Sequence, residues 1–213
     1  PPYVETWLKH QIRDEYWQHG SVCENYADIE CAVYVVGGWG DAYTNAVPRL
    51  LAGLPGPKKG LIGPWAHEYP HAARPGPQVG FLQECLRWWD YWLKGIDTGI
   101  MDEPLLRAWI QDNVSPASYY EERPGYWVVE SEWPSPDEPK TYWLGETSLD
   151  GSLSTDCHLS LQGSQFTGSE AGFWLAYGEK VDFPTDQRAD DGRSLTFTSE
   201  PADESMAILG NPE

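Results

Sequence analysis

Two short apolar runs in the first third of the chain predict neighbouring strands of a parallel sheet. The residues Val33–Val36 are β-branched or aromatic and stop at Gly37-Gly38, and the run Leu61-Ile62 stops at Gly63-Pro64. Neither run alternates with polar residues, which is typical of parallel strands covered on both faces. The segment 44–53 between them is helix-like, so the pattern favours an α/β sheet.

The clearest helical periodicity follows a proline-rich loop. Pro77 lies near the start of this segment and Gly95 just past its end, which are the usual places for these residues at helix termini. A shorter helix is expected around Val4–Leu8, a turn at 14–17, and a further strand at Leu105–Ile110. We expect the apolar stripe of the long helix to pack against the sheet as structure. Its members are Leu82, Cys85, Leu86, Trp89, Trp92 and Leu93.

The pattern changes near Pro124. From there on, short β-rich pieces alternate with clusters of Gly, Ser, Asp and Pro, and no helical period remains. This predicts an antiparallel sandwich and not more of the α/β sheet, with a boundary at residues 120–126. The expected strands are Tyr126–Val129, Thr141–Leu144, Phe173–Tyr177 and Ser194–Thr198.

Composition narrows the classes of partner. The 213 residues allow one large or two ordinary domains and carry a formal net charge of −19, which argues against a nucleic-acid surface because phosphate binding needs clustered Lys and Arg. No apolar run approaches the 18 residues that a membrane span needs. The four cysteines are far apart, Cys31 and Cys85 are expected in the core, and disulfides are not suggested. A reducing, cytoplasmic location is therefore favoured.

Each of the two predicted strands delivers one polar group. Asp41 follows the first strand and His67 follows the second. Taken alone, Asp41 could be a turn residue that caps the next helix, and His67 could be a surface residue of a loop. Together, at adjacent strand ends, they match the last two members of the order serine, acid, histidine found in α/β-hydrolases. We therefore interpret Asp41 and His67 as the acid and base of a catalytic triad.

The nucleophile of such a triad is missing from the sequence. A nucleophile elbow needs the pattern G-x-S-x-G on a strand-to-helix turn. None of the Gly-Ser pairs of the chain meets it: Gly20-Ser21, Gly151-Ser152, Gly163-Ser164 and Gly168-Ser169.

A zinc site is the competing interpretation of His67. The residues 67–71 spell H-E-x-x-H, which binds zinc when both histidines lie on one face of a helix. Pro70 inside the segment disfavours that helix by about 3 kcal/mol or more, and no third ligand is evident. We expect His71 to be a loop residue near the site, and no metal or other cofactor. The acidic run around Asp186 and Asp190 is expected to form ion pairs with Arg188 and Arg193.

Five ordered segments together resemble the cocaine-esterase and X-Pro dipeptidyl-peptidase-like (S15-like) branch of the α/β-hydrolases. The likeness extends over nearly the whole chain, and five segments in the right order are more specific than any one of them. They are residues 37–43 (Gly-Gly-Trp-Gly-Asp-Ala-Tyr), 63–67 (Gly-Pro-Trp-Ala-His), 87–95 (Arg-Trp-Trp-Asp-Tyr-Trp-Leu-Lys-Gly), 132–136 (Glu-Trp-Pro-Ser-Pro) and 186–195 (Asp-Gln-Arg-Ala-Asp-Asp-Gly-Arg-Ser-Leu).

The resemblance implies a three-part enzyme. It assigns residues 1–24 to the end of a helical cap, 25–122 to the C-terminal half of an α/β-hydrolase domain, and 123–213 to the start of a jelly-roll, galactose-binding-like domain. It also implies that Asp41 is the triad acid, that His67 is the general base, and that Tyr43 lines the acyl pocket. The serine and the oxyanion hole would lie upstream of Pro1. We therefore expect an internal fragment that is inactive alone and that exposes an apolar sheet edge.

The expected activity is hydrolysis of a small-molecule ester or an Xaa-Pro peptide by a serine enzyme. Two alternatives remain open: a non-catalytic piece whose β-domain binds carbohydrate or a partner, and a zinc metalloprotease that uses His67, Glu68 and His71. The sequence does not decide the substrate or the oligomeric state.

Overall fold

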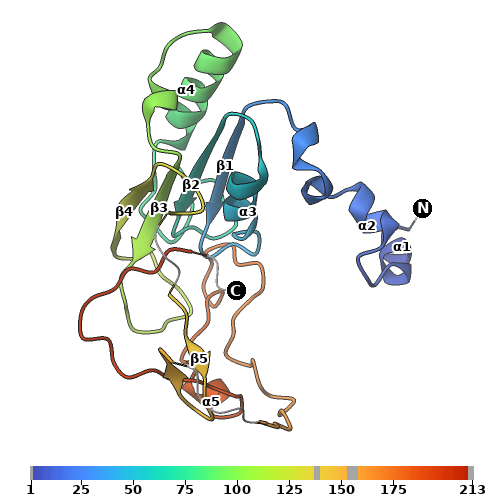
Figure 1. Cartoon of the computed structure of the whole chain (residues 1–213), viewed down its shortest axis with the longest axis vertical. Coiled ribbons are helices and arrows are strands. Elements are labelled where there is room, and N and C mark those ends of the chain that lie inside the picture. Colours follow the sequence, from blue (N-terminus) through green and yellow to red (C-terminus); the bar gives the residue numbers. More distant parts are fainter. Residues whose placement is uncertain (1, 137–139, 153–157, 211–213) are drawn as a thin grey trace.

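A mixed sheet of four strands organises the chain in the computed structural model, which describes residues 2–136, 140–152 and 158–210. The strand order is β1-β2-β3-β4, with β1, β2 and β3 parallel and β4 antiparallel to β3 (Figure 1). The strands are β1 (Val33–Gly38), β2 (Lys58–Gly63), β3 (Leu106–Gln111) and β4 (Gly125–Glu130). The strands expected from the first two apolar runs and from Leu105–Ile110 are therefore confirmed.

The two faces of the sheet carry separate apolar clusters. Helix α3 (Ala46–Gly53) confirms the helix expected at residues 44–53. It packs on one face of the sheet, where its Leu51 is fully buried against Ile62 and Leu106. On the other face, Leu61 packs with Trp65 and Ala73. Neighbouring residues of β2 point to opposite faces. Both faces of this strand are covered, which explains the continuous apolar run in the sequence.

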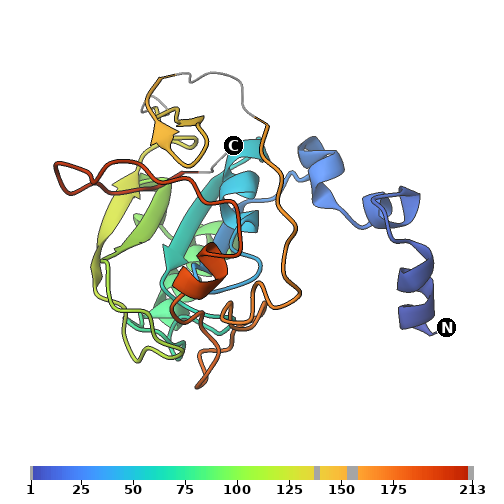
Figure 2. The same cartoon turned by 90° about the horizontal axis from the view of Figure 1, so that it is seen from below.

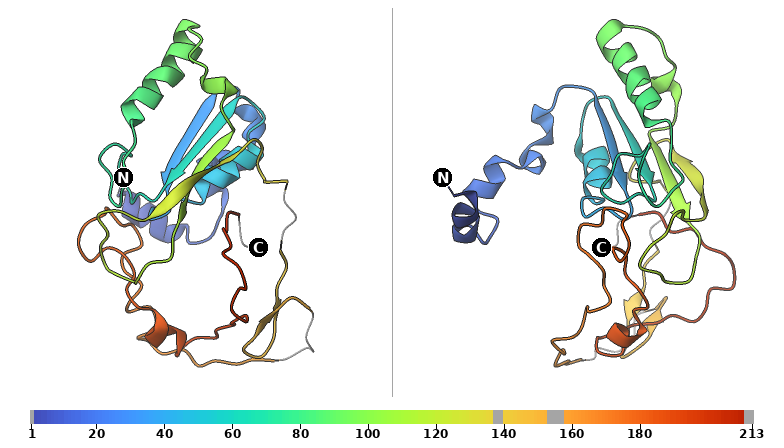
Figure 3. Two further views of the ribbon diagram at one scale, coloured as in Figure 1. Left: turned by 90° about the vertical axis from the view of Figure 1, so that its left-hand side faces the viewer. Right: turned by 180° about the vertical axis from the view of Figure 1, so that it is seen from behind.

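The long helix α4 (Phe81–Lys94) forms where its periodicity predicts, but it does not pack as expected. It ends at Gly95, which adopts the left-handed conformation with φ 67°, and its only buried residue is Trp88. The predicted stripe is largely exposed, with Leu82 at 60% and Leu93 at 74%. The helix projects beyond the amino-terminal ends of the parallel strands (Figures 1 and 3). The expectation that the apolar stripe of α4 packs on the sheet is therefore wrong. Helical periodicity identifies an apolar face of a helix but not the segment that covers this face.

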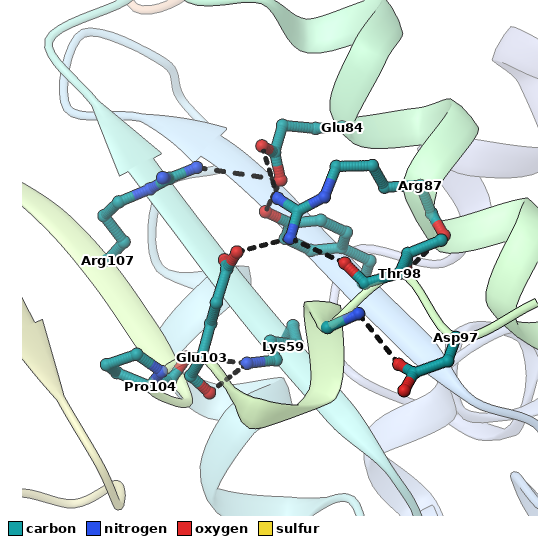
Figure 4. Close-up of polar contacts among 10 residues, drawn as sticks. Lys59, Glu84, Arg87, Asp97, Thr98, Glu103, Pro104 and Arg107 are labelled. Atoms are coloured by element: carbon teal, nitrogen blue, oxygen red, sulfur yellow. Dashed lines mark hydrogen bonds and ion pairs between the residues drawn. The ribbon is translucent and has the colours of Figure 1, made fainter.

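Polar contacts instead fix the first turns of α4 to the sheet (Figure 4). The Arg87 guanidinium pairs with Glu84 at 3.1 Å and also with Glu103, and the Glu84 carboxylate lies 3.8 Å from Arg107 of β3. Buried Lys59 of β2 donates to the carbonyl oxygens of Glu103 and Pro104. Burial lowers the pKa of this lysine. The amino-terminal ends of β2 and β3 are thus tied to the helix and to the short helix η3 (Ile100–Asp102).

Tyr34, at the start of β1, makes the stability of this contact region depend on pH in the alkaline range. Its hydroxyl is 3.5 Å from Glu84, and burial, followed by the Glu84 charge, raises the pKa of the phenol. Above about pH 10 the unfolded chain releases the phenol proton while the folded chain retains it, so stability falls as pH rises. Tyr34→Phe is expected to make the free energy of unfolding fall less steeply between pH 10 and 11, measured by urea unfolding. All other titrating groups are common to both proteins, so equal slopes would contradict the assignment.

The C-terminal part departs most from expectation. The strand expected at Tyr126–Val129 is β4, which extends the main sheet through β3 and does not open a separate sandwich. β5 (Trp143–Leu144) and β6 (Leu149–Asp150) form a hairpin, so the strand at Thr141–Leu144 is confirmed in its second half. Phe173–Tyr177 is not a strand, and Ser194–Thr198 makes one isolated bridge, from Thr198 to Ser148. A β-rich composition fixes neither strand partners nor sheet membership.

The N-terminal segment lies away from the sheet (Figures 1 and 2). Helix α1 (Tyr3–Lys9) is where a helix was expected. The expected turn at 14–17 instead begins helix α2 (Glu15–His19), because the Asp14 side chain caps it by accepting the Tyr16 N–H at 3.1 Å. Short helices η1 (Val22–Glu24) and η2 (Tyr26–Asp28) lead to β1. Within the described residues, no helix is long and apolar enough to cross a membrane.

The cysteines are less buried than expected. Cys31 is exposed and Cys85 is half-buried, so the expectation that both are core residues is wrong. Cys31 precedes the sheet, and Cys85 lies on the uncovered helix α4. These two and Cys23 are free thiols, while Cys157 is outside the described residues.

Candidate active site

The carboxyl ends of β1 and β2 are held level with each other. Gly38 pairs with Gly63 at the last position of both strands. Beyond it, the Trp39 N–H donates to Gly63 O and the Gly40 N–H donates to Trp65 O, both at 2.9 Å. A Cβ atom at Gly38 would lie 2.0 Å from the Trp65 carbonyl oxygen. Glycine therefore permits the two segments to leave the sheet in contact, which brings the residues after them together.

Asp41 is fixed in a tight turn directly after β1. Its N–H donates to Gly38 O at 3.1 Å, and its Oδ1 accepts the Tyr43 N–H at 2.9 Å. The carboxylate serves the turn with only one oxygen, and it does not cap the next helix as the alternative interpretation held, because the N-cap of α3 is Asn45. The side chain is 13% exposed, and Oδ2 is directed to another partner.

That partner is His67, which follows β2. Its Nδ1 lies 2.9 Å from Asp41 Oδ2. The described residues offer no hydrogen bond to its Nε2, and the side chain is 40% exposed. When Nδ1–H donates to the carboxylate, Nε2 carries the lone pair and is the basic nitrogen. The structure thus brings together the two residues that the sequence selected, in the arrangement of an acid that orients a base.

Two tyrosines flank the imidazole. Tyr43, the expected pocket residue, has its ring centroid 5.6 Å from that of His67, and its side chain is exposed. Tyr177 makes an edge contact at 5.5 Å and 86°, and the neighbouring Ala176 carbonyl accepts the His67 N–H at 2.8 Å. Sequence reasoning missed Tyr177 because it is 110 residues further along the chain and in a segment expected to be a strand. No local pattern in the sequence identifies it.

A cavity of about 460 Å³ borders the Asp41 side of the pair. Two buried polar atoms at this cavity, Thr44 Oγ1 and Arg123 Nε, have no hydrogen-bond partner among the described residues. Aromatic side chains from distant segments form much of its wall, including Trp39, Tyr120, Trp174 and Phe183. His67 is outside this lining, so the cavity adjoins Asp41 and not His67.

The structure does not provide the helix that a zinc protease motif needs. Residues 67–71 lie in bends and turns, and the His71 ring stacks on Phe81 at 6.1 Å. Within residues 2–136, 140–152 and 158–210, no group of three or more His, Cys, Asp or Glu side chains could hold a metal ion. His71 is a loop residue, as expected.

The acidic run forms the expected ion pairs. Asp186 pairs with Arg188, which lowers the pKa of Asp186 to about 2. Asp190 lies 3.5 Å from Arg193, and its carboxylate also accepts the Glu170 N–H. These contacts surround the short helix α5 (Arg188–Asp191).

Comparison with known proteins places both parts of the chain. Residues 1–69 match the model of the X-Pro dipeptidyl-peptidase (S15 family), and residues 98–213 match that of the X-Pro dipeptidyl-peptidase C-terminal non-catalytic domain. Two proteins named as candidate serine esterases, from Mycobacterium bovis and Mycobacterium tuberculosis, are each 29% identical over 197 residues. The match covers 84% of this chain and 29% of each relative. The chain therefore spans less than a third of their length.

Solved structures show the same fold at low identity. Two crystal structures of a CocE/NonD family hydrolase from Staphylococcus aureus superpose with TM-scores of 0.52 and 0.53, at 13% and 14% identity. Each match covers 71% of this chain and 26% of the other. The mixed α/β arrangement of this chain is thus shared with these two structures.

Proposed function

Because the chain belongs to the X-Pro dipeptidyl-peptidase (S15-like) family, we propose that it supplies the acid and the base of a serine hydrolase. The observation that carries the proposal is the 2.9 Å contact between His67 Nδ1 and Asp41 Oδ2, while Nε2 has no hydrogen-bond partner in the part of the chain that the structure describes. The partly exposed imidazole beside a nearly buried carboxylate is what proton transfer to and from a substrate requires.

In the proposed reaction, a serine from outside these 213 residues attacks the carbonyl carbon of the substrate. His67 Nε2 takes the serine proton and passes it to the leaving alcohol or amine, which leaves an acyl-enzyme. Water then attacks in the same way, His67 again takes and returns a proton, and the serine is restored. Asp41 holds the Nδ1–H tautomer and stabilises the imidazolium that forms.

The proposed substrate is a small ester or an Xaa-Pro peptide. Exposed Tyr43 next to His67 is proposed to contact the acyl group, since aromatic rings offer a large apolar surface to a substrate. The residues after β4 are proposed to begin a jelly-roll, galactose-binding-like domain. The hairpin of β5 and β6 supports the β-rich character of this proposed domain but not its jelly-roll topology.

The test is active-site labelling of a polypeptide that carries this chain together with the proposed nucleophile. A fluorophosphonate probe is expected to label it and to abolish ester hydrolysis, while a zinc chelator leaves both unchanged. The 213 residues alone are expected to give neither labelling nor hydrolysis. Loss of activity with the chelator would favour the metalloprotease. Absence of both labelling and hydrolysis from the longer polypeptide would favour a non-catalytic binding role.

A further inference from the structure

We propose that Asp182 is a positioning residue for His67, acting through the loop of residues 172–184. The catalytic consequence of this inference rests on the proposed function. That the loop holds His67 in place is argued separately, from the contacts between the loop and this residue. It also concerns a segment that matches the model of a non-catalytic domain. The claim is that this segment determines where the base lies.

The loop meets His67 at two points. The Ala176 carbonyl oxygen accepts the His67 backbone N–H at 2.8 Å, which fixes the chain from which the imidazole projects. The Tyr177 ring packs edge-on against the imidazole at 5.5 Å. Asp41 also holds Nδ1, and the Tyr43 ring centroid lies 5.6 Å from that of the imidazole. Together these contacts restrict both the backbone and the side chain of His67.

Asp182 in turn determines the shape of the loop. Its Oδ2 accepts the N–H groups of Tyr177 at 2.7 Å and of Glu179 at 2.9 Å. Its own carbonyl oxygen accepts the Phe173 N–H at 2.9 Å. One residue therefore ties both sides of the turn that presents Ala176 and Tyr177. Hydrogen bonds from backbone N–H groups to a carboxylate are charge-assisted and stronger than neutral ones.

Asp182 is one of the residues that line the cavity next to Asp41, and its side chain is almost fully enclosed by protein. It is 91% buried, as only 9% of the residue is exposed. No ion pair connects it to a Lys or Arg of the described residues. A buried carboxylate is costly unless hydrogen bonds compensate it, and here the compensating donors are the N–H groups of the turn itself. The carboxylate and the turn therefore depend on each other.

Strained backbone around Asp182 also indicates that this loop is held in one conformation. Val181, a β-branched residue, has φ 73°, which is a genuine outlier for such a side chain. Gly172 and Gly178 also have positive φ, and a Cβ atom on Gly172 would lie 2.5 Å from the Asp182 carbonyl oxygen. Strain of this kind persists where surrounding contacts over-determine the conformation, and it gathers at functional sites. The loop is thus held in one shape directly beside the base.

The experiment compares Asp182→Ala with Asp182→Asn in the polypeptide that also carries the proposed nucleophile. Alanine removes the acceptor of both N–H groups, whereas the asparagine carbonyl can still accept them. We expect Asp182→Ala to lower kcat by about 10²-fold, the cost of displacing a catalytic group by roughly 1 Å, with KM changed less than about twofold. Asp182→Asn is expected to restore most of kcat. Asp186→Ala, which removes an exposed carboxylate of the same region, is the matched control and should leave kcat unchanged.

A second measurement separates this proposal from the proposed function. The imidazole ¹⁵N signals of His67, assigned by their absence in His67→Ala, are expected to shift or broaden in Asp182→Ala and to stay unchanged in Asp182→Asn and Asp186→Ala. This readout needs no turnover, so it decides the positioning role even if no ester or peptide is hydrolysed. Unchanged His67 signals in folded Asp182→Ala would overturn the inference, as would a loss of kcat no larger than the loss of folded protein.

Discussion

Replacing His67 with alanine is expected to lower kcat for ester hydrolysis by about 10²–10⁴-fold, the usual contribution of a general base. The reason is that Nε2 of His67 is the nitrogen left free to accept the serine proton while Asp41 Oδ2 holds Nδ1 at 2.9 Å. Labelling by a fluorophosphonate probe should weaken in parallel, because it requires the same activated serine. Both are measured on the polypeptide that carries this chain and the proposed nucleophile.

The matched control is His71→Ala. His71 is four residues further on, is exposed, and stacks on Phe81 at 6.1 Å. A serine hydrolase should retain its kcat in this variant, whereas a zinc enzyme of the H-E-x-x-H type would lose activity in both variants, since each histidine would be a ligand. Equal losses in His67→Ala and His71→Ala would therefore count against the triad, and unchanged turnover in His67→Ala would reject it.

Replacing Trp65 with alanine is expected to lower the free energy of unfolding by about 3–5 kcal/mol, the range for deleting a buried Trp side chain. Trp65 is 1% exposed and packs with Leu61 and Ala73. Its Nε1–H also donates to Pro77 O at 2.8 Å, so alanine leaves a cavity and removes a hydrogen bond. Denaturant unfolding, with the midpoint and the slope both fitted, measures the change.

Trp174→Ala is the control for tryptophan removal as such. Trp174 is 86% exposed, so its loss should change the free energy of unfolding by no more than about 0.5 kcal/mol. Similar effects of the two substitutions would mean that Trp65 is not part of the core as described. Trp65 also stands between the core and the site, because its carbonyl oxygen accepts the Gly40 N–H one residue before Asp41. Trp65→Ala should therefore also disturb the turn that holds Asp41.

The contact between Asp41 and His67 could be predicted from the sequence because the information is local. Glycine stops two apolar runs, and one polar residue follows each stop within four positions. Parallel strands end at the same edge of a sheet, so the two side chains had to approach each other if the strands were neighbours. The register of Gly38 with Gly63 supplies that condition.

The strands and helices near the site, and the approach of Asp41 to His67, follow from the sequence because they depend on residues that are close together in the chain. Three outcomes came from the tertiary structure. Strand β4 joins the sheet, and the apolar face of α4 stays exposed over Leu82 and Leu93. Tyr177 packs against His67, and Asp182 accepts the Tyr177 N–H. These outcomes depend on contacts between residues far apart in the chain. An apolar pattern in the sequence predicts that a surface is buried, but only the folded structure shows which segment, if any, covers it.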